Sequence, residues 1–175
     1  MKSSVRRLVF CAILAALYCA LTIACYGIAY GPVQFRISEV FCILPFFAPW
    51  SVWGLYVGCM LANLFTSANV LLDVVFGSLA TLFAGLCTAY FGRGWREDGS
   101  FAWGARILAC LMPVLFNAVT VGAMLAALFP LASGFWTSFL IFAAQVGAGE
   151  AAVMFLLGLP AMTLLPRTGI LKFLK

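Results

Sequence analysis

Two ionisable residues one helical turn apart, Arg36 and Glu39, stand in a stretch that is otherwise almost free of charge. Only 9% of the residues are charged, so an acid and a base at this spacing need a local reason to be there. Together a guanidinium and a carboxylate can donate and accept hydrogen bonds to a polar solute. The same spacing allows the two side chains simply to pair with each other at a helix start. The pair is therefore read as lining a site, with mutual pairing as the alternative.

Composition defines the class of protein that must position this pair. The chain has 66% hydrophobic residues and a mean hydropathy of +1.15. Its 175 residues cannot hide that much apolar surface in a soluble core. Several apolar runs also reach membrane-spanning length. The sequence therefore predicts an integral membrane protein with one transmembrane domain, whose first segment follows basic residues as a signal peptide would but is long enough to be a retained anchor.

Helix lengths predict an all-α bundle of six transmembrane helices. We expect helices at 5–26, 37–48, 51–66, 70–91, 105–129 and 135–165. The second and third are shorter than a full bilayer, so they are expected to tilt or to end inside it.

Basic residues give an independent check on six crossings. With six, the N-terminus, the 92–106 loop and the C-terminus share one side, and these places hold nine of the ten cationic residues. They are Lys2, Arg6, Arg7, Arg93, Arg96, Arg106, Arg167, Lys172 and Lys175. The positive-inside rule then places both termini in the cytoplasm. The basic charge is thus a topology signal and gives little support to nucleic-acid binding.

Polar residues from several segments fall at similar depths when counted from this side at 1.5 Å per residue. Glu150 lies roughly 25 Å up, Asp73 about 30 Å and Asn63 about 21 Å, while Asn117 sits nearer the middle at about 16 Å. Glu39 belongs to the same outer half. Ionisable groups inside a membrane usually face a cavity or a partner. We therefore expect an outward-opening pocket for a small, amine-rich ligand.

Simpler roles exist for most of these residues. Asp73 can complement the dipole at the start of its helix. Asn63, Asn117 and Gln145 can be hydrogen-bonding groups between helices, and Trp136 can belong to an interfacial aromatic belt. Glu150 has the weakest such alternative, because it lies well inside a span and follows Gly147 and Gly149, where a local helix break is expected.

A second pattern is the repeat Ala12, Ala16, Ala20 on the first helix. These residues share one face, and small side chains there let another helix approach closely. The pattern alone is not specific, because alanine is frequent and packing within the chain also explains it.

The sequence lacks the residues that several classes of chemistry require. The chain has no histidine and its seven cysteines form no C-x-x-C pair, so no cofactor, zinc, haem or iron–sulfur ligand set is expected. The cysteines are read as small packing residues. No phosphate-binding loop occurs, so the chain cannot hydrolyse ATP itself. An enzyme is a weaker interpretation, because no histidine, serine–base pair or metal set accompanies the acids.

Three blocks, YGPVQFRISEVFCILPFF (30–47), GLYVGCMLANLF (54–65) and LLDVVFGSLATL (71–82), resemble the QueT family over nearly the whole chain. These proteins are substrate-binding (S) components of energy-coupling factor (ECF) transporters, associated with uptake of queuosine precursors. The resemblance implies a six-helix cell-membrane protein that works with a transmembrane coupling protein and two cytoplasmic ATPases. It also implies that Ala12, Ala16 and Ala20 dock the coupling protein.

The implied ligand, a 7-deazaguanine such as preQ1, preQ0 or queuine, presents a ring N–H and an exocyclic amine side by side. One carboxylate can accept both, and Glu150 or Asp73 is the candidate. Glu39 would take an aminomethyl ammonium, Arg36 or Gln34 the ring carbonyl, and Asn117 or Gln145 the remaining edges. Trp136 or Phe116 would stack on the base.

An alternative interpretation, from another class of protein, is a small homodimeric ion-coupled transporter in which Glu150 and Asp73 carry protons. It predicts transport driven by a pH gradient without ATPases.

Overall fold

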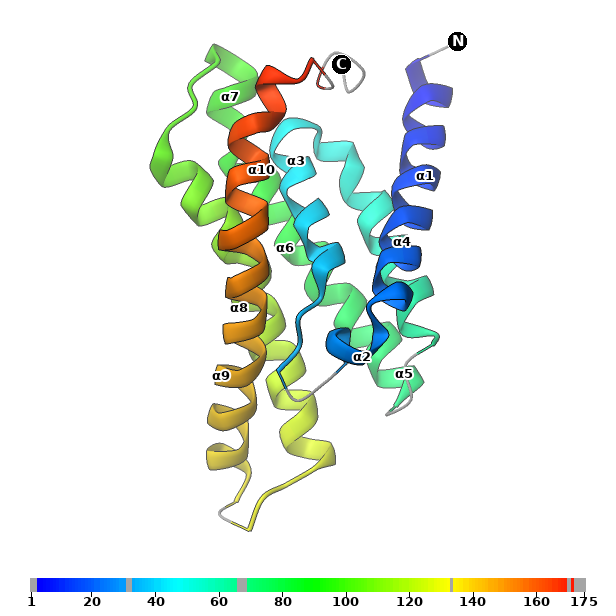
Figure 1. The fold of residues 1–175 in the computed structure, drawn as a ribbon, viewed down its shortest axis with the longest axis vertical. Helices are drawn as coiled ribbons and strands as arrows, with labels where there is room; N and C mark the ends of the chain where they lie inside the picture. The colour runs from blue at the N-terminus through cyan, green and yellow to red at the C-terminus, as the bar shows by residue number, and fades with distance from the viewer. Residues whose placement is uncertain (1–2, 31–32, 66–68, 133, 170, 172–175) are drawn as a thin grey trace.

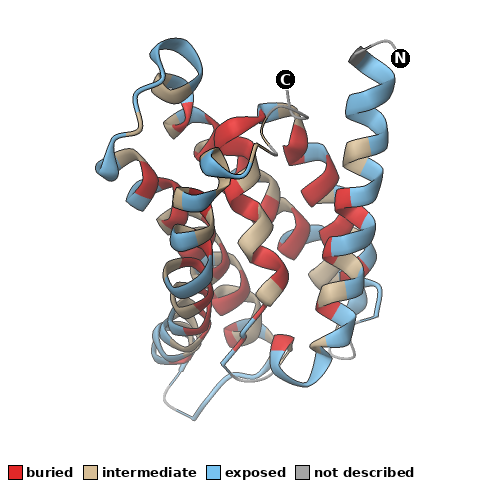
Figure 2. Ribbon diagram, turned by 45° about the horizontal axis from the view of Figure 1, so that its top comes forward, coloured by how far each residue is buried: buried red, intermediate tan, exposed pale blue. Residues whose placement is uncertain are grey.

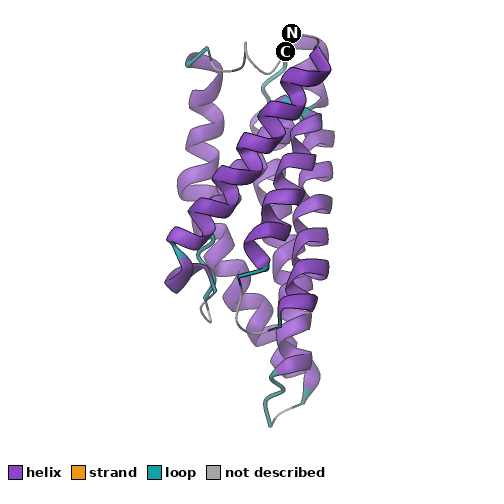
Figure 3. Cartoon of the chain, turned by 90° about the vertical axis from the view of Figure 1, so that its right-hand side faces the viewer, coloured by secondary structure: helices purple, strands orange, loops and turns teal. Residues whose placement is uncertain are grey.

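The computed structural model describes residues 3–30, 33–65, 69–132, 134–169 and 171. Within these residues all regular structure is helical, without strands, as predicted. Figure 1 shows an elongated bundle in which the first helix begins and the last helix ends at the same end. Figure 3 shows the two termini at one end from a second direction. The chain therefore traverses the bundle an even number of times.

Four helical stretches are long and apolar enough to cross a membrane. They are Ser4–Ala24, Val70–Phe91, Trp103–Leu128 and Phe135–Arg167. The remaining two predicted crossings correspond to the shorter segments Ile37–Phe47 and α4 (Val52–Asn63). The structure thus shows four candidate spans and two short apolar segments packed among them.

Between the first and second spans lie the two short segments, and the chain turns back before, between and after them. Helix α1 (Ser3–Ala24) breaks at Cys25, and the single turn α2 (Tyr26–Ala29) follows. After Arg36 the predicted helix 37–48 is mostly a 3₁₀ helix, η1 (Ile37–Ile43), continued by the α-helical turn α3 (Leu44–Phe47) and by η2 (Pro49–Ser51). The expectation of a regular α-helix here is therefore corrected to a tighter helix with a short α-helical end, which contains Pro45 and stops before Pro49.

Two long stretches contain one π-helical turn each. The second span runs through α5 (Val70–Leu72), the π turn η3 (Asp73–Gly77) and α6 (Ser78–Phe91). The last runs through α9 (Phe135–Val153), the π turn η4 (Met154–Gly158), α10 (Leu159–Leu164) and η5 (Leu165–Arg167). The predicted break at Gly147 and Gly149 is wrong, because α9 continues through both residues.

The described basic residues other than Arg36 gather at one end of the bundle. They lie at the start of α1, in α7 (Arg93–Asp98), at the start of α8 (Trp103–Leu128) and at the end of η5, all at the top of Figure 1. Three of the predicted topology residues, Lys2, Lys172 and Lys175, lie outside the described residues. The opposite end carries α2, α5 and the turn between α8 and α9.

Helices α1 and α4 pack closely through small residues. A Cβ on Gly54 would lie 2.8 Å from the Cys11 carbonyl oxygen, and one on Gly58 would lie 2.9 Å from the Ala15 Cα. The other face of α1 is exposed, and Figure 2 shows it in pale blue. Ala12, Ala16 and Ala20 all lie on this exposed face. Packing within the chain therefore does not account for the alanine repeat.

Candidate functional site

Glu39 is the centre of a buried hydrogen-bond network that joins three segments. Its side chain is fully buried. The Tyr18 hydroxyl on α1 donates to Oε1, and the Cys42 thiol lies 2.8 Å from Oε2. Thr81 Oγ1 on α6 lies 3.3 Å from Oε1. Both carboxylate oxygens of Glu39 thus have partners within the protein.

The 3₁₀ geometry of η1 explains how these groups align. In a 3₁₀ helix the side chains at i and i+3 lie above one another, which brings Cys42 directly to Glu39. The preceding residue, Ser38, faces α1 and lies 2.6 Å from the Thr22 hydroxyl. Tyr18 and Thr22 are four residues apart and share a face of α1. The first helix therefore holds η1 at two successive positions.

Arg36 is buried beside this network, with 4% of its surface exposed. Its Nη1 atom lies 3.9 Å from Cys59 Sγ, and its Cζ atom lies 5.3 Å from the centre of the Tyr30 ring. Within the described residues no ion pair joins Arg36 to Glu39, and Arg36 Nε has no hydrogen-bond partner. The alternative that the two residues simply pair is therefore not what the structure shows.

Glu150 enters the same region from α9. Only 1% of its surface is exposed, and it interacts electrostatically with both Glu39 and Arg36. Its Oε2 atom has no hydrogen-bond partner among the described residues. The region therefore contains one buried cation and two buried carboxylates, of which only Glu150 has an oxygen left without a partner.

Gly149 explains why Gln34 lies against α9. A Cβ at this position would overlap the backbone carbonyl oxygen of Gln34. Only a glycine lets the extended segment cross the helix so closely. Gln34 is 8% exposed, so the crossing covers its side chain as well. The glycine predicted to break the helix instead makes room for a neighbouring segment.

Asn117 and Gln145 lie on the two antiparallel helices α8 and α9. Ala118 faces Gly147, since a Cβ on Gly147 would lie 3.3 Å from the Ala118 Cβ. Asn117 is therefore about two residues, or roughly 3 Å, from the level of Glu150 along the bundle. Neither amide atom of buried Asn117 has a partner among the described residues, and the same is true of Gln145 Oε1. Both residues thus remain compatible with ligand contact.

Asn63 and Asp73 form a neighbouring contact between α4 and η3. Asn63 Nδ2 donates to the Asp73 carbonyl oxygen at 2.8 Å and lies 3.4 Å from Cys59 Sγ. The Tyr30 hydroxyl donates to the Ala62 carbonyl oxygen at 3.0 Å. Burial raises the pKa of Tyr30 to about 12, so this hydroxyl stays protonated. Asn63 acts here as a link between helices, one of the two roles expected from the sequence.

Trp136 is the candidate that the structure does not bring to this region. It is 75% exposed in the first turn of α9 and packs only against Phe135 and Phe139 among the ring contacts. Fourteen residues separate it from Glu150, or about 21 Å along the helix. Its position agrees with the aromatic-belt alternative.

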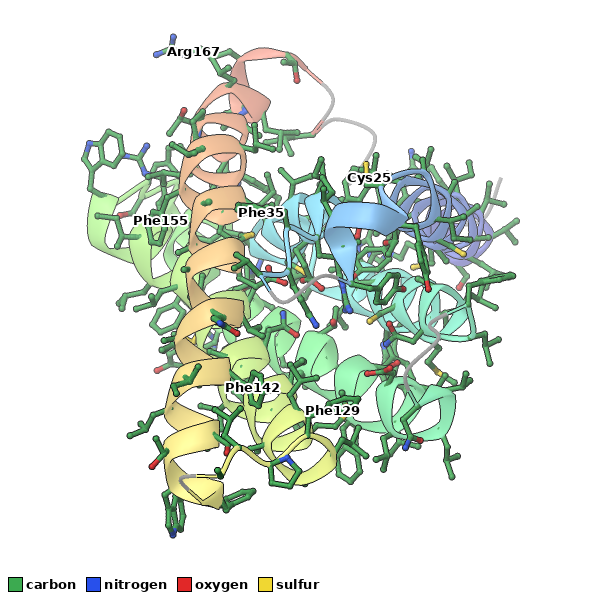
Figure 4. The ribbon with its side chains drawn as sticks, turned by 60° about the horizontal axis from the view of Figure 1, so that its bottom comes forward. Cys25, Phe35, Phe129, Phe142, Phe155 and Arg167 are labelled. Carbon is green, nitrogen blue, oxygen red and sulfur yellow. The ribbon has the colours of Figure 1, made fainter. Side chains whose placement is uncertain are left out.

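Six of the nine predicted binding residues are therefore deeply buried within the bundle. They are Gln34, Arg36, Glu39, Asn63, Asn117 and Glu150. Asp73 and Gln145 are half-buried at the margin. Figure 4, seen from the end that carries α2 and α5, shows side-chain nitrogen and oxygen atoms gathered between the helices.

Sequence reasoning missed the residues that hold Glu39. Tyr18 and Thr81 were not singled out, and Cys42 and Cys59 were read as packing residues. Both thiols in fact contact polar groups of this cluster. The spacing of Tyr18 and Thr22, on the face of α1 opposite the alanines, was the available signal. Among the described residues no group of three His, Cys, Asp or Glu side chains could hold a metal ion.

A polytopic helical protein with one cation and two acids enclosed between its helices belongs to the class of membrane proteins that handle a polar solute. The profile of the QueT transporter family matches residues 8–167, and the chain belongs to this family. It is 37% identical over 109 residues to a protein of Lactococcus lactis subsp. cremoris (strain MG1363) named queuosine precursor transporter QueT. That alignment covers 61% of this chain and 62% of the relative. No solved structure matches the chain.

Proposed function

We propose that this protein is the substrate-binding subunit of an ECF-type importer and captures a queuosine precursor. Membership of the QueT transporter family supports the transport of such a precursor. The observation that carries a binding role is Glu150, a buried carboxylate with one oxygen that lacks a protein partner. Leaving a buried acceptor unsatisfied costs free energy, which a ligand donor would recover.

The structure favours different roles for the two carboxylates. Glu39 receives protein contacts at both oxygens, so we assign it to holding η1 and balancing Arg36. Glu150 then accepts the ring N–H and exocyclic amine of a 7-deazaguanine as two parallel hydrogen bonds. Arg36 or Gln34 donates to the ring carbonyl, and Asn117 or Gln145 takes a remaining edge. Asp73, half-buried at the margin, would meet a ligand ammonium.

Energy coupling is proposed to come from partner proteins. Ala12, Ala16 and Ala20 lie on the exposed face of α1, where small side chains permit close approach of a helix from a transmembrane coupling protein. Two cytoplasmic ATPases would complete the importer. We place the basic end of the bundle, with both termini, in the cytoplasm and the six apolar segments across the membrane.

Calorimetric titration of the purified protein in nanodiscs with 7-deazaguanine bases tests the ligand class, with guanine as the matched control. Tight binding of one precursor and much weaker binding of guanine are expected. Absence of binding by folded protein would contradict the proposal. Transport into proteoliposomes by this chain alone, driven by a pH gradient, would instead support the ion-coupled alternative.

A further inference from the structure

An apolar groove runs along the outside of the bundle between α1, η1 with α3, and α10. Its volume is about 390 Å³, and every residue that lines it is apolar. Next to it, at the basic end, lies a hollow of about 650 Å³ that contains two arginines, Arg7 and Arg96. Neither space touches the Glu150 region.

The wall formed by α1 places a cation at one end of an apolar stripe. Phe10, Leu14 and Leu17 line the groove, and Arg7 lines the hollow. These residues follow Arg7 by three, seven and ten positions, so all four share one helical face. The stripe from Arg7 to Leu17 is about 15 Å long, which is half of a hydrocarbon core about 30 Å thick. The groove is therefore long enough to hold an acyl chain across one leaflet.

The other two walls show the same order. Along the second wall, Phe41 and Leu44 line the groove, and Phe47 and Trp50 line the hollow. The Phe10 and Trp50 rings are in contact, with centroids 5.2 Å apart, so the walls of the two spaces touch.

Along α10 and its continuation, Ala161 and Leu165 line the groove, and Pro166 and Leu171 line the hollow. All three walls thus run from the groove into the hollow, where α1 contributes Arg7 and α7 contributes Arg96. The groove and the hollow therefore adjoin along the three walls.

From this arrangement we propose that the groove binds an anionic phospholipid, with one acyl chain along α1 and the phosphate in the hollow at Arg7. Arg96 already makes two hydrogen bonds within the protein. Its Nη1 atom donates to the Phe46 carbonyl oxygen and its Nη2 atom to the Ala89 carbonyl oxygen, each at 2.7 Å. Arg7 is exposed and stacks only loosely, 5.9 Å from the centre of the Trp50 ring. Arg7 is therefore the arginine free to contact a phosphate, and Arg96 adds positive charge beside it.

Native mass spectrometry of the protein, purified with an equimolar mixture of phosphatidylglycerol and phosphatidylcholine, tests this site. Wild-type protein is expected to retain one phosphatidylglycerol in preference to phosphatidylcholine. Arg7→Gln should weaken this preference about fivefold, the effect of one basic residue at a membrane surface. Arg93→Gln is the matched control, because Arg93 does not line the hollow. Equal retention of the two lipids, or equal loss in both variants, would overturn the proposal.

A second pair of variants tests the acyl chain. Leu17→Trp fills the groove and should reduce retention of both lipids, whereas Val9→Trp, on an exposed part of α1 outside the groove, should not. Unchanged melting temperatures would show that the variants are folded. If Leu17→Trp blocks assembly with a coupling protein but leaves lipid retention unchanged, the groove is a protein-docking surface and the lipid proposal fails. None of these measurements depends on the transported solute.

Discussion

The two carboxylates buried in the bundle have opposite surroundings. Glu39 sits on a 3₁₀ helix and is held by Tyr18 and Cys42, with Thr81 within reach. Glu150 sits on a regular α-helix, is equally buried, and has an oxygen without a protein partner. The comparison separates an acid that organises the fold from an acid that is available to a ligand.

Burial alone does not distinguish the two acids, because both side chains are almost completely buried. What distinguishes them is the count of donors around each oxygen, because a buried acceptor without a donor is destabilising unless something else supplies one. Arg36 interacts electrostatically with both acids. The comparison predicts that mutations around Glu39 act on stability, and that mutation of Glu150 acts on binding.

Glu39→Ala should have the largest effect on the free energy of unfolding. It removes the acceptor of Tyr18 and leaves buried Arg36 with less compensating charge, at a cost on the order of 3 kcal/mol. Thermal unfolding in detergent, followed by tryptophan fluorescence, measures the loss. Glu97→Ala is the control, since Glu97 is an exposed acid on α7. Equal melting temperatures for the two variants would contradict the structural role of Glu39.

Gly149→Ala should come next, because the new Cβ would overlap the Gln34 carbonyl oxygen and push the extended segment off α9. Overpacking of this kind costs about 1–3 kcal/mol. Gly147→Ala is the matched control two residues away, where the new Cβ meets only the Ala118 Cβ at 3.3 Å. In the same unfolding assay, Gly149→Ala should have a clearly lower melting temperature than Gly147→Ala. The reverse order would mean that the 33–36 segment does not rest on Gly149.

Tyr18→Phe should have a smaller effect, about 1–2 kcal/mol, because it deletes one hydroxyl donor and keeps the ring. Hydrogen exchange of the η1 amides would show the local consequence, since η1 loses one of its links to α1 and should exchange faster. Tyr56→Phe, in α4, is the control. Unchanged exchange in η1 would show that the Tyr18 hydroxyl does not hold this segment.

Glu150→Gln should have the smallest effect on unfolding in the absence of ligand. The substitution replaces a buried carboxylate that has an unpartnered oxygen with a neutral group of the same shape, so stability should change little or rise slightly. Differential scanning calorimetry of the ligand-free protein checks this. A loss comparable to that of Glu39→Ala would show that Glu150 also organises the fold.

Much of the fold was predictable from apolar periodicity and length. The predicted helices 70–91, 105–129 and 135–165 agree with the observed stretches to within two residues. The 3₁₀ helix was not predictable, because its apolar run reads equally well as an α-helix. The π turns likewise leave no signal in hydropathy.

The charged residues of the site were predictable from the sequence. The residues that hydrogen-bond to them were not. Arg36, Glu39 and Glu150 stand out because charge is rare in this chain. Tyr18 and Thr81 do not, since hydroxyl-bearing residues are common in membrane helices and only the folded structure brings them to Glu39. Trp136 was included on the basis of residue type, but its place along α9 separates it from Glu150.

The most direct test of the division between the two acids is ligand binding by Glu150→Gln. Calorimetric titration of wild-type, Glu150→Gln and Glu97→Gln protein with the preferred 7-deazaguanine would compare their affinities at equal stability. The account predicts wild-type affinity for Glu97→Gln and a loss of about tenfold or more for Glu150→Gln, the cost of losing hydrogen bonds to a charged acceptor. Unchanged affinity in folded Glu150→Gln protein would contradict the assignment of Glu150 as the ligand carboxylate.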